Sequence, residues 1–318
     1  MSAAVQIDGY LVGEVLGRGG SATVYDAARV GDGRRVALKV LDHRVRRGER
    51  ELAALVAIGE VPGVIEVLEV VETAQGATCL VLERMHESAA ARLQREGPFS
   101  VVEVVRIGRV VGAALEGMHR LGVAHRDVKP GNVLLGEGMG SDLEVRLADF
   151  DIALLIDVEA STETVGSLTP PHAAPERFTG SDSGSPAADI WSLGSTLFTL
   201  LHGEPPFGGA RDDGGVAGLA HRVMSEPSAA LMRSDVPAGL VAVIDRCLAK
   251  DPLDRWASAG DVVTALDGLD GVDGGRDGPV EPESSVLVDG STTTTAMTWA
   301  IWAAGVAVGL FVLWLALR

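Results

Sequence analysis

The segment HRDVKPGN, residues 125–132, concentrates charged and polar side chains directly before the apolar run VLL at 133–135. A carboxylate such as Asp127 can accept the proton of an attacking hydroxyl. Lys129 can neutralise a phosphoryl group in transfer, and the Asn132 amide can hold a metal ion. Core packing does not account for so many titratable groups beside a strand, and a solvated loop is the remaining alternative. The segment therefore indicates a phosphoryl-transfer site.

Lysine is kept at few positions in a chain that otherwise uses arginine. Of the 27 basic residues, only Lys39, Lys129 and Lys250 are lysines. Ammonium and guanidinium groups are not interchangeable where a point charge must meet a phosphate. Lys39 ends the apolar segment VALK (36–39), where a charge is costly unless an anion meets it. Lys39 is therefore a second candidate for phosphate contact.

A glycine-rich stretch precedes Lys39 in the segment LGRGGSATVY (16–25). Glycine lets the backbone approach a phosphate closely, and the strand-type residues on both sides predict a hairpin flap. The motif alone is more often an ordinary turn. Its interpretation as a phosphate cover depends on Lys39, which lies fifteen residues after Val24.

The hydrophobic periodicity changes along the chain. Short β-type runs occur at 36–41, 64–72 and 79–83, with one helical stretch at about 49–58. From about residue 101 the apolar residues recur with helical spacing. The pattern predicts an α+β, bilobal protein: a small antiparallel sheet lobe at about 8–85 and a larger, mainly helical lobe at 86–266.

Composition excludes several other classes of protein. A hydrophobic fraction of 47% with 22% charged residues is typical of globular chains and excludes collagen and wholesale disorder. The net charge of −17 disfavours nucleic-acid binding. Cys79 and Cys247 lie far apart in apolar runs without metal spacing, which predicts buried thiols in a reducing compartment.

The C-terminal part has a different composition. Residues 267–296 are rich in Gly, Asp, Pro, Ser and Thr and predict an acidic, disordered linker. Residues 297–317 are uncharged, and 21 residues at about 1.5 Å each span about 31 Å, the thickness of a bilayer core. They predict one transmembrane helix, with a buried core helix as the alternative. Residues 1–9 have no signal-peptide pattern.

The order of the motifs strongly resembles the eukaryotic-type (Hanks-type) serine/threonine protein kinases of bacteria over about residues 10–266. The motifs are GRGGSATV (17–24), VALK (36–39), HRDVKPGN (125–132), Asp149-Phe150, APE (174–176) and DIWSLG (189–194). The resemblance implies a protein-kinase fold and transfer of the ATP γ-phosphoryl to protein Ser/Thr hydroxyls, including those of its own activation loop. It implies ATP with Mg²⁺ as cofactors, Mn²⁺ being the alternative ion.

The resemblance also implies roles for individual residues. Lys39 contacts the α- and β-phosphates and pairs with Glu51, or alternatively Glu49. Asp127 orients the substrate hydroxyl and Lys129 stabilises the transferred group, while Asn132 and Asp149 bind the metal. The expected nucleotide-binding residues are Leu16, Gly17, Arg18, Gly19, Gly20, Ser21, Ala22, Val24, Ala37, Lys39, Leu82, Glu83, Met85, Asn132 and Leu134.

Regulatory and structural roles follow from the same resemblance. Arg126 marks kinases that are switched on when an activation-loop phosphate pairs with this arginine. The candidate sites are Ser161, Thr162, Thr164 and Ser167. Glu176 is expected to pair with Arg255, and Asp189 to bind the backbone of the catalytic loop.

Three departures from the family pattern leave an alternative open. Asp151 replaces the glycine after Asp149-Phe150, Ala22 replaces the third loop glycine, and about four extra residues lie around 136–142. Asp151 raises the hypothesis of a nucleotide-binding pseudokinase or membrane-tethered scaffold. Retention of a base and two metal ligands favours the enzyme. The APE and DIWSLG segments disfavour a small-molecule phosphotransferase.

The chemistry also predicts a location. ATP is cytoplasmic, so we expect a single-pass cell-membrane protein with its kinase domain in the cytoplasm. The charges that flank residues 297–317 give little support for either orientation. Gly305 and Gly309 have the GxxxG spacing of helix dimers, although chance accounts for this equally well. The expected partners are ATP, protein substrates and a second copy of the chain.

Overall fold

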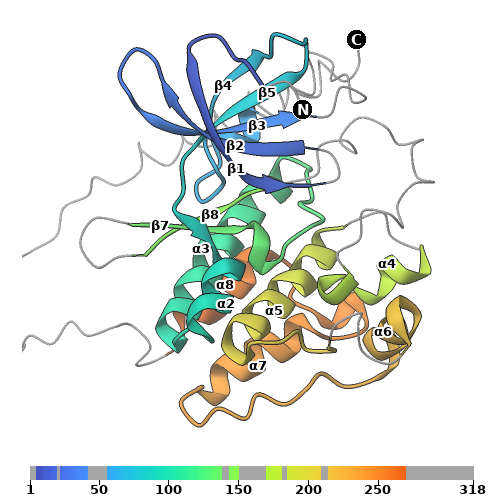
Figure 1. Ribbon diagram of the computed structural model, residues 1–318. Helices are drawn as coiled ribbons and strands as arrows, with labels where there is room; N and C mark the ends of the chain where they lie inside the picture. The colour runs from blue at the N-terminus through green and yellow to red at the C-terminus, as the bar shows by residue number, and fades with distance from the viewer. Residues whose placement is uncertain are drawn as a thin grey trace, which may run out of the picture. The chain divides into compact units, whose positions relative to one another are not determined.

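A five-stranded antiparallel sheet forms the small lobe in the computed structural model, which describes residues 5–19, 22–41, 56–137, 143–149, 170–180, 185–208 and 214–269 (Figure 1). These residues all belong to the first of two units, residues 1–272. The strands run in the order β1-β2-β3-β5-β4. Their bounds are β1 Tyr10–Arg18, β2 Ala22–Arg29, β3 Arg35–Leu41, β4 Val67–Glu72 and β5 Thr78–Glu83.

The two faces of this sheet have different roles. Successive side chains of a strand point to opposite faces. On β3, Val36 and Leu38 join an apolar cluster that includes Cys79 and Val81 of β5. The alternate positions, such as Lys39, face the other way. This second face looks toward the large lobe and carries the candidate nucleotide contacts.

Short strands connect the two lobes. The strand β6 (Glu87–Ser88) pairs with β7 (Val133–Glu137), which pairs with β8 (Leu143–Leu147). Ile65 donates a backbone hydrogen bond to Leu147 O at 2.9 Å, and Leu147 N donates to Gly63 O at 2.7 Å. Gly63 has φ +86°, and a Cβ there would lie 3.0 Å from Val110 O. Only glycine fits this junction without strain.

Helices dominate the large lobe, where the long α3 and the central α5 form its core (Figure 1). A capping box of Ser100 and Glu103 starts α3. Almost all of α5 is buried, including Trp191. The helices are α2 Ala89–Glu96, α3 Val101–Arg120, α4 Pro175–Thr179, α5 Pro186–His202, α6 Gly215–Ser225, α7 Ala238–Cys247 and α8 Ala259–Asp267, with 3₁₀ turns η1 Pro130–Asn132, η3 Pro170–His172 and η4 Pro252–Asp254.

This architecture is the bilobal α+β fold expected from the sequence, with one local difference. The strand predicted for 64–72 begins only at Val67, because residues 63–65 bond to β8 instead. Of the helix predicted for about 49–58, the structure describes residues 56–58, which are helical, and residue 59 continues the helix. Cys79 and Cys247 are free and fully buried, and burial raises the pKa of each thiol to about 12.

The predicted linker and transmembrane helix lie outside the described residues, apart from residues 267–269. Within the described ranges, no helix combines the length and apolar character that a membrane crossing requires. The four extra residues predicted around 136–142 fall at the connection between β7, which ends at Glu137, and β8, which begins at Leu143.

Candidate active site

The predicted catalytic loop, residues 125–132, has side chains that converge on the Asp127 carboxylate. Lys129 Nζ donates to Asp127 Oδ2 at 2.6 Å, and Asn132 Nδ2 donates to the same oxygen at 3.0 Å. Asn132 Nδ2 also donates to the Asp127 backbone oxygen at 2.7 Å. The turn η1, which starts at Pro130, folds the chain back so that Asn132 reaches Asp127. The structure thus brings together the base, cation and amide that the sequence indicated.

Asp189 holds the backbone that carries Asp127. Its side chain lies in the first turn of α5 and is only 1% exposed. The carboxylate accepts from the backbone N–H groups of His125 and Arg126, both at 2.7 Å. It also lies 2.8 Å from His119 Nε2. A buried carboxylate requires such partners, so the catalytic loop has its position fixed from within the large lobe.

His125 links the catalytic loop to the end of β8. Its Nε2 lies 3.1 Å from Ala148 O, and Asp127 N donates to its Nδ1 at 3.3 Å. This pattern requires a neutral ring protonated at Nε2. Burial lowers the pKa of His125 and outweighs the nearby carboxylates, so the ring stays neutral. His125 therefore acts as a fixed spacer between Asp127 and the residue next to Asp149.

An ion pair joins the small lobe to this site. Lys39 Nζ donates to Asp149 Oδ1 at 2.6 Å. Partial burial alone would raise the pKa of Asp149, but the Lys39 charge and hydrogen bond outweigh it, so the pKa lies below its usual value. Asp149 lies two residues after the end of β8 and has φ +64°, a conformation uncommon outside glycine. The carboxylate is thereby turned toward Lys39.

The glycine-rich hairpin has room for a ligand. Gly17 lies opposite Val24 across the β1–β2 ladder, and Gly19 N donates to Ala22 O at 2.9 Å. A Cβ at Gly17 would meet no atom within 4 Å, and one at Gly19 only Ala22 O at 3.7 Å. Packing within the described chain therefore does not require glycine at either position. Close approach of a phosphate would require it.

The expected adenine contacts share one face of the sheet and the lobe junction. Ala37 lies opposite Leu82, and Lys39 lies opposite both Val24 and Leu80. Leu134 lies opposite Ser88 on the β6–β7 ladder, and Met85 is buried. These residues form an apolar platform of the kind that binds a purine ring. Leu16 and Arg18 lie on β1 beside it, and both are exposed.

Glu83 differs from its neighbours on this platform because protein groups already bind its side chain. Its Oε1 accepts from Glu66 N at 2.9 Å and from Arg146 Nε at 2.8 Å. The carboxylate is therefore used to connect β5 to β8. Any contact of Glu83 with a nucleotide would come from its backbone.

The donor set fits a magnesium–nucleotide complex. Both side-chain hydrogen bonds of Asn132 use the amide nitrogen, which leaves the amide oxygen as a ligand atom, and Asp149 offers a carboxylate. In the described part of the chain no group of three or more His, Cys, Asp or Glu residues forms a complete metal site. Mg²⁺ typically takes one or two protein oxygens and completes its shell with phosphate oxygens and water. Two protein ligands match that requirement.

The Glu176–Arg255 pair fixes the segment before α5. Arg255 Nη1 and Nη2 donate to the two Glu176 oxygens at 2.7 and 2.8 Å. The Arg255 side chain is 0% exposed, and it also donates to the backbone oxygens of Ala249, Ala187 and Lys250. Every guanidinium nitrogen is thus satisfied, which a buried cation requires.

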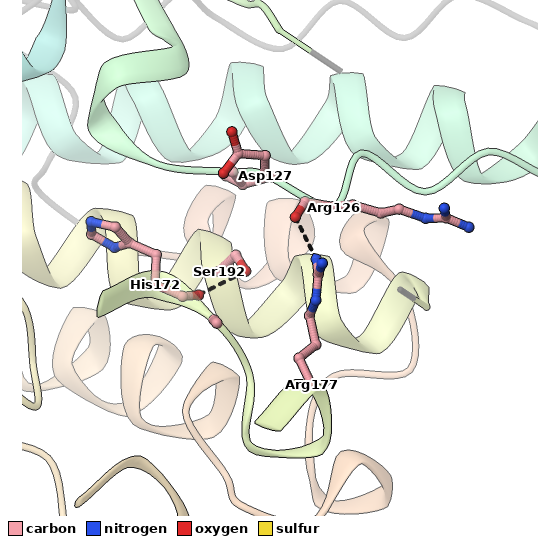
Figure 2. Close-up of a pocket in the computed structure, with 7 residues that line it drawn as sticks. Arg126, Asp127, His172, Arg177 and Ser192 are labelled. Atoms are coloured by element: carbon pink, nitrogen blue, oxygen red, sulfur yellow. Dashed lines mark hydrogen bonds between the residues drawn. The ribbon is translucent and has the colours of Figure 1, made fainter. Parts of the chain in front are cut away.

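A small pocket beside Asp127 contains residues that sequence reasoning missed (Figure 2). Arg177 Nη1 donates to Arg126 O at 2.5 Å. The ring of His172 lies 2.9 Å from Ser195 Oγ, and Ser192 Oγ donates to His172 O at 2.9 Å. Burial lowers the pKa of His172 to about 4. The signal in the sequence was weak: Arg177 directly follows Glu176, and His172 lies four residues before it.

Several predicted residues lie outside the described part of the chain. They are Gly20, Ser21, Glu49, Glu51, Asp151, Ser161, Thr162, Thr164 and Ser167. Among the described residues, the hydrogen-bond partner of Lys39 is Asp149. The predicted pairing of Lys39 with Glu51 and the effect of Asp151 stay predictions.

Known proteins are similar in sequence to most of the unit that contains this site. The family described as Protein kinase domain matches residues 10–265. The chain is 35% identical over 255 residues to the serine/threonine-protein kinase PknK of Mycobacterium tuberculosis, covering 78% of this chain and 22% of that protein. It is 34% identical over 271 residues to PknE of the same species, covering 82% of this chain and 46% of that protein.

A solved structure supports the fold independently. The chain superposes with a TM-score of 0.64 on the crystal structure of Rad53 residues 1–466 in complex with AMP-PNP, at 21% identity, covering 81% of this chain and 64% of that one. The chain spans less than half the length of the PknK and PknE relatives. The family match over residues 10–265 nevertheless covers most of the sequence. The chain therefore belongs to the protein kinase family, among relatives named serine/threonine-protein kinases.

Proposed function

We propose that this chain is an ATP-dependent serine/threonine protein kinase that transfers the γ-phosphoryl group to protein hydroxyls. The observation that carries the proposal is the Asp127 carboxylate, which Lys129 and Asn132 contact at 2.6 and 3.0 Å. Asp189 holds the backbone beneath it. A scaffold that only binds nucleotide has no need of a base and cation placed together in this way.

Residues of both lobes take part in the proposed reaction. Asp127 accepts a hydrogen bond from the acceptor hydroxyl and orients it for attack. Lys129 neutralises charge on the transferred group, and Lys39 holds the phosphates from the small lobe. Asn132 and Asp149 hold Mg²⁺, which neutralises the phosphate oxygens when it is bound. Most of the catalytic effect then comes from position and charge.

The test is transfer of labelled γ-phosphate from ATP by the full chain, with Mg²⁺ or Mn²⁺, to itself and to a generic protein substrate. The Asp127→Asn variant keeps the shape of the side chain but removes the base. We expect incorporation to fall about 10²–10⁴-fold in this variant while ATP still raises its melting temperature. An absence of incorporation by the unmodified chain with either metal, despite stabilisation by ATP, would instead favour the nucleotide-binding scaffold.

A substitution at Asp151 tests the scaffold alternative directly. A second carboxylate two positions after Asp149 in the sequence is expected to disfavour binding of phosphate, and aspartate adopts the backbone angles of glycine only at a cost. We propose that Asp151 lowers turnover or shifts the metal preference toward Mn²⁺. Asp151→Gly is expected to raise the rate with Mg²⁺, measured by the same transfer. An unchanged rate with both metals would exclude this role.

We also propose that phosphorylation of the activation loop regulates the enzyme. Arg126 Nε and Nη1 are buried, and neither has a hydrogen-bond partner in the part of the chain that the structure describes. A buried cation of this kind is stabilised by a phosphate. Phosphopeptide mapping of the autophosphorylated chain is expected to find phosphate on Ser161, Thr162, Thr164 or Ser167, and Arg126→Met should remove the activation that follows.

We further propose that the C-terminal region anchors the protein in the cell membrane. Residues 297–317 are long and apolar enough to span a bilayer, and residues 267–296 supply an acidic tether. The kinase domain faces the cytoplasm, where ATP is found. Deletion of residues 297–317 is expected to move the protein from the membrane fraction to the supernatant. A single copy in native membranes would argue against self-association through Gly305 and Gly309.

A further inference from the structure

We infer that Arg177 is a positioning residue for Asp127, an inference that rests on the proposed kinase function. Arg177 lies on α4, outside the catalytic loop, and donates to the backbone oxygen of the residue before Asp127 at 2.5 Å. Figure 2 shows its side chain rising toward that carbonyl from the segment below the loop. The contact joins positions that are 51 residues apart.

The conformation of Arg126 explains why this contact matters. Arg126 has φ +70°, and among the described residues the only other non-glycine residue with positive φ is Asp149. A side chain disfavours this region, so the conformation persists only where surrounding contacts hold it. Both unusual residues lie directly at the chemical site.

Both polar backbone groups of Arg126 are held by charged side chains. Its N–H donates to Asp189 Oδ1 at 2.7 Å, and its carbonyl accepts from Arg177. The Arg126 carbonyl and the Asp127 N–H belong to one planar peptide unit. The Asp127 N–H donates to His125 Nδ1 at 3.3 Å, a longer contact than the one that Asp189 makes with the Arg126 N–H. Arg177 therefore sets the orientation of the peptide plane from which the Asp127 side chain projects.

Arg177 is itself held in place by its neighbour. Glu176 binds the fully buried Arg255 through two hydrogen bonds, which anchors the first turn of α4. A guanidinium stays charged throughout the physiological pH range, so its bond to the carbonyl is charge-assisted at every pH of interest. The buried ion pair thus supports the catalytic loop through Arg177, besides fixing α4.

The consequence for the reaction is specific. Loss of the Arg177 bond lets the 126–127 peptide rotate, and small misplacement of a reacting group reduces the rate strongly. The expected nucleotide contacts come from Lys39, Asp149 and the β1–β2 hairpin, whereas Arg177 lies on α4 and donates to the Arg126 carbonyl. Arg177 should therefore affect kcat and leave the KM for ATP nearly unchanged.

The experiment compares Arg177→Met with Arg222→Met in the full chain. Arg222 on α6 is a matched control, because its Nε also donates to a backbone oxygen, that of Phe207, at 2.9 Å. We expect kcat to fall about 10- to 100-fold in Arg177→Met, with the KM for ATP within about twofold. Arg222→Met should keep kcat within about twofold. Arg177→Lys retains a charged donor and should recover part of the rate.

Hydrogen exchange gives a readout that does not need turnover. The amide of Asp127 should exchange at least about tenfold faster in Arg177→Met and at the normal rate in Arg222→Met. This result would support the inference even if the unmodified chain transfers no phosphate, an outcome that would contradict the proposed function alone. A normal kcat with normal exchange in a folded Arg177→Met variant would overturn the inference. Equal losses of kcat in both variants would overturn it as well.

Discussion

The catalytic loop and the glycine-rich hairpin, both assigned to phosphoryl transfer, are held in different ways. The loop around Asp127 is bound from beneath by the buried Asp189, by His125 and by Arg177. The hairpin side is exposed, and the Lys39–Asp149 pair has a carboxylate that is 52% exposed. In the proposed reaction the base is therefore fixed in advance, and the nucleotide cover is completed by its ligand.

Asp189→Asn should have the largest effect on the fixed side. An asparagine keeps one oxygen but turns an NH₂ group toward a backbone donor, so at least one of the N–H groups of His125 and Arg126 is left unsatisfied. We expect a loss of about 3–5 kcal/mol in the free energy of unfolding, measured by urea titration. The matched control is Asp235→Asn, in an exposed pair with Arg233, which should leave the stability unchanged.

His172→Gln should change how stability depends on pH. Burial lowers the pKa of His172 to about 4, against 6.5 in the unfolded chain. Between these pH values the unfolded chain binds a proton that the folded chain does not, so stability falls as the pH is lowered through this window. His172 should account for up to about 3 kcal/mol of the change in the free energy of unfolding over this window, and His172→Gln should lack that change.

Unfolding titrations at pH 6.5 and pH 4.5 measure the difference, with His221→Gln on the exposed side of α6 as the control. His221→Gln should leave the pH dependence as it is. If His172→Gln also leaves the pH dependence unchanged, burial beside the catalytic loop does not hold His172 in its neutral form.

Lys39→Met should separate stability from activity on the exposed side. The ion pair with Asp149 is partly solvated, so the free energy of unfolding without nucleotide should change by less than about 1 kcal/mol. Turnover should fall about 10²-fold or more, because the phosphates lose their cation. A large loss of stability in the absence of ATP would show that Lys39 supports the fold itself.

Gly17→Ala should have the smallest effect on stability. A Cβ at Gly17 meets no atom within 4 Å, and alanine restricts the unfolded chain, so stability should stay the same or rise by up to about 1 kcal/mol. The KM for ATP should rise. Gly63→Ala is the contrasting variant, since φ +86° and Val110 O at 3.0 Å make alanine destabilising there. Thermal unfolding with and without ATP distinguishes the two.

The sequence predicted the residues of the site better than the contacts that hold them. Asp127, Lys129 and Asn132 lie within six positions of one another, so local spacing was enough to group them. The two-lobe fold followed from the change in periodicity between residues 83 and 101. In contrast, His119, His172 and Arg177 act across long separations, and a helical pattern does not indicate which polar residue turns inward.

The sequence pattern also failed to predict where β4 begins. Residues 64–66 carry the β-type pattern of the strand that follows, yet the backbone of residues 63–65 pairs with β8. A pattern with period two predicts extended backbone but not its pairing partner. Likewise, the left-handed backbone of Arg126 and Asp149 depends on the contacts of the folded site: arginine gives no sign of it, and aspartate adopts it in only a minority of cases.

The most direct test of the contrast is hydrogen exchange on the full chain, with and without Mg²⁺ and a non-hydrolysable ATP analogue. We expect the amides of His125 and Arg126 to be protected already without nucleotide and to change little when it binds, because Asp189 holds both. The amides of the β1–β2 hairpin should slow markedly on binding. If the amides of His125 and Arg126 exchange freely until the analogue is added, Asp189 does not fix the base in advance and the two regions do not differ in this way.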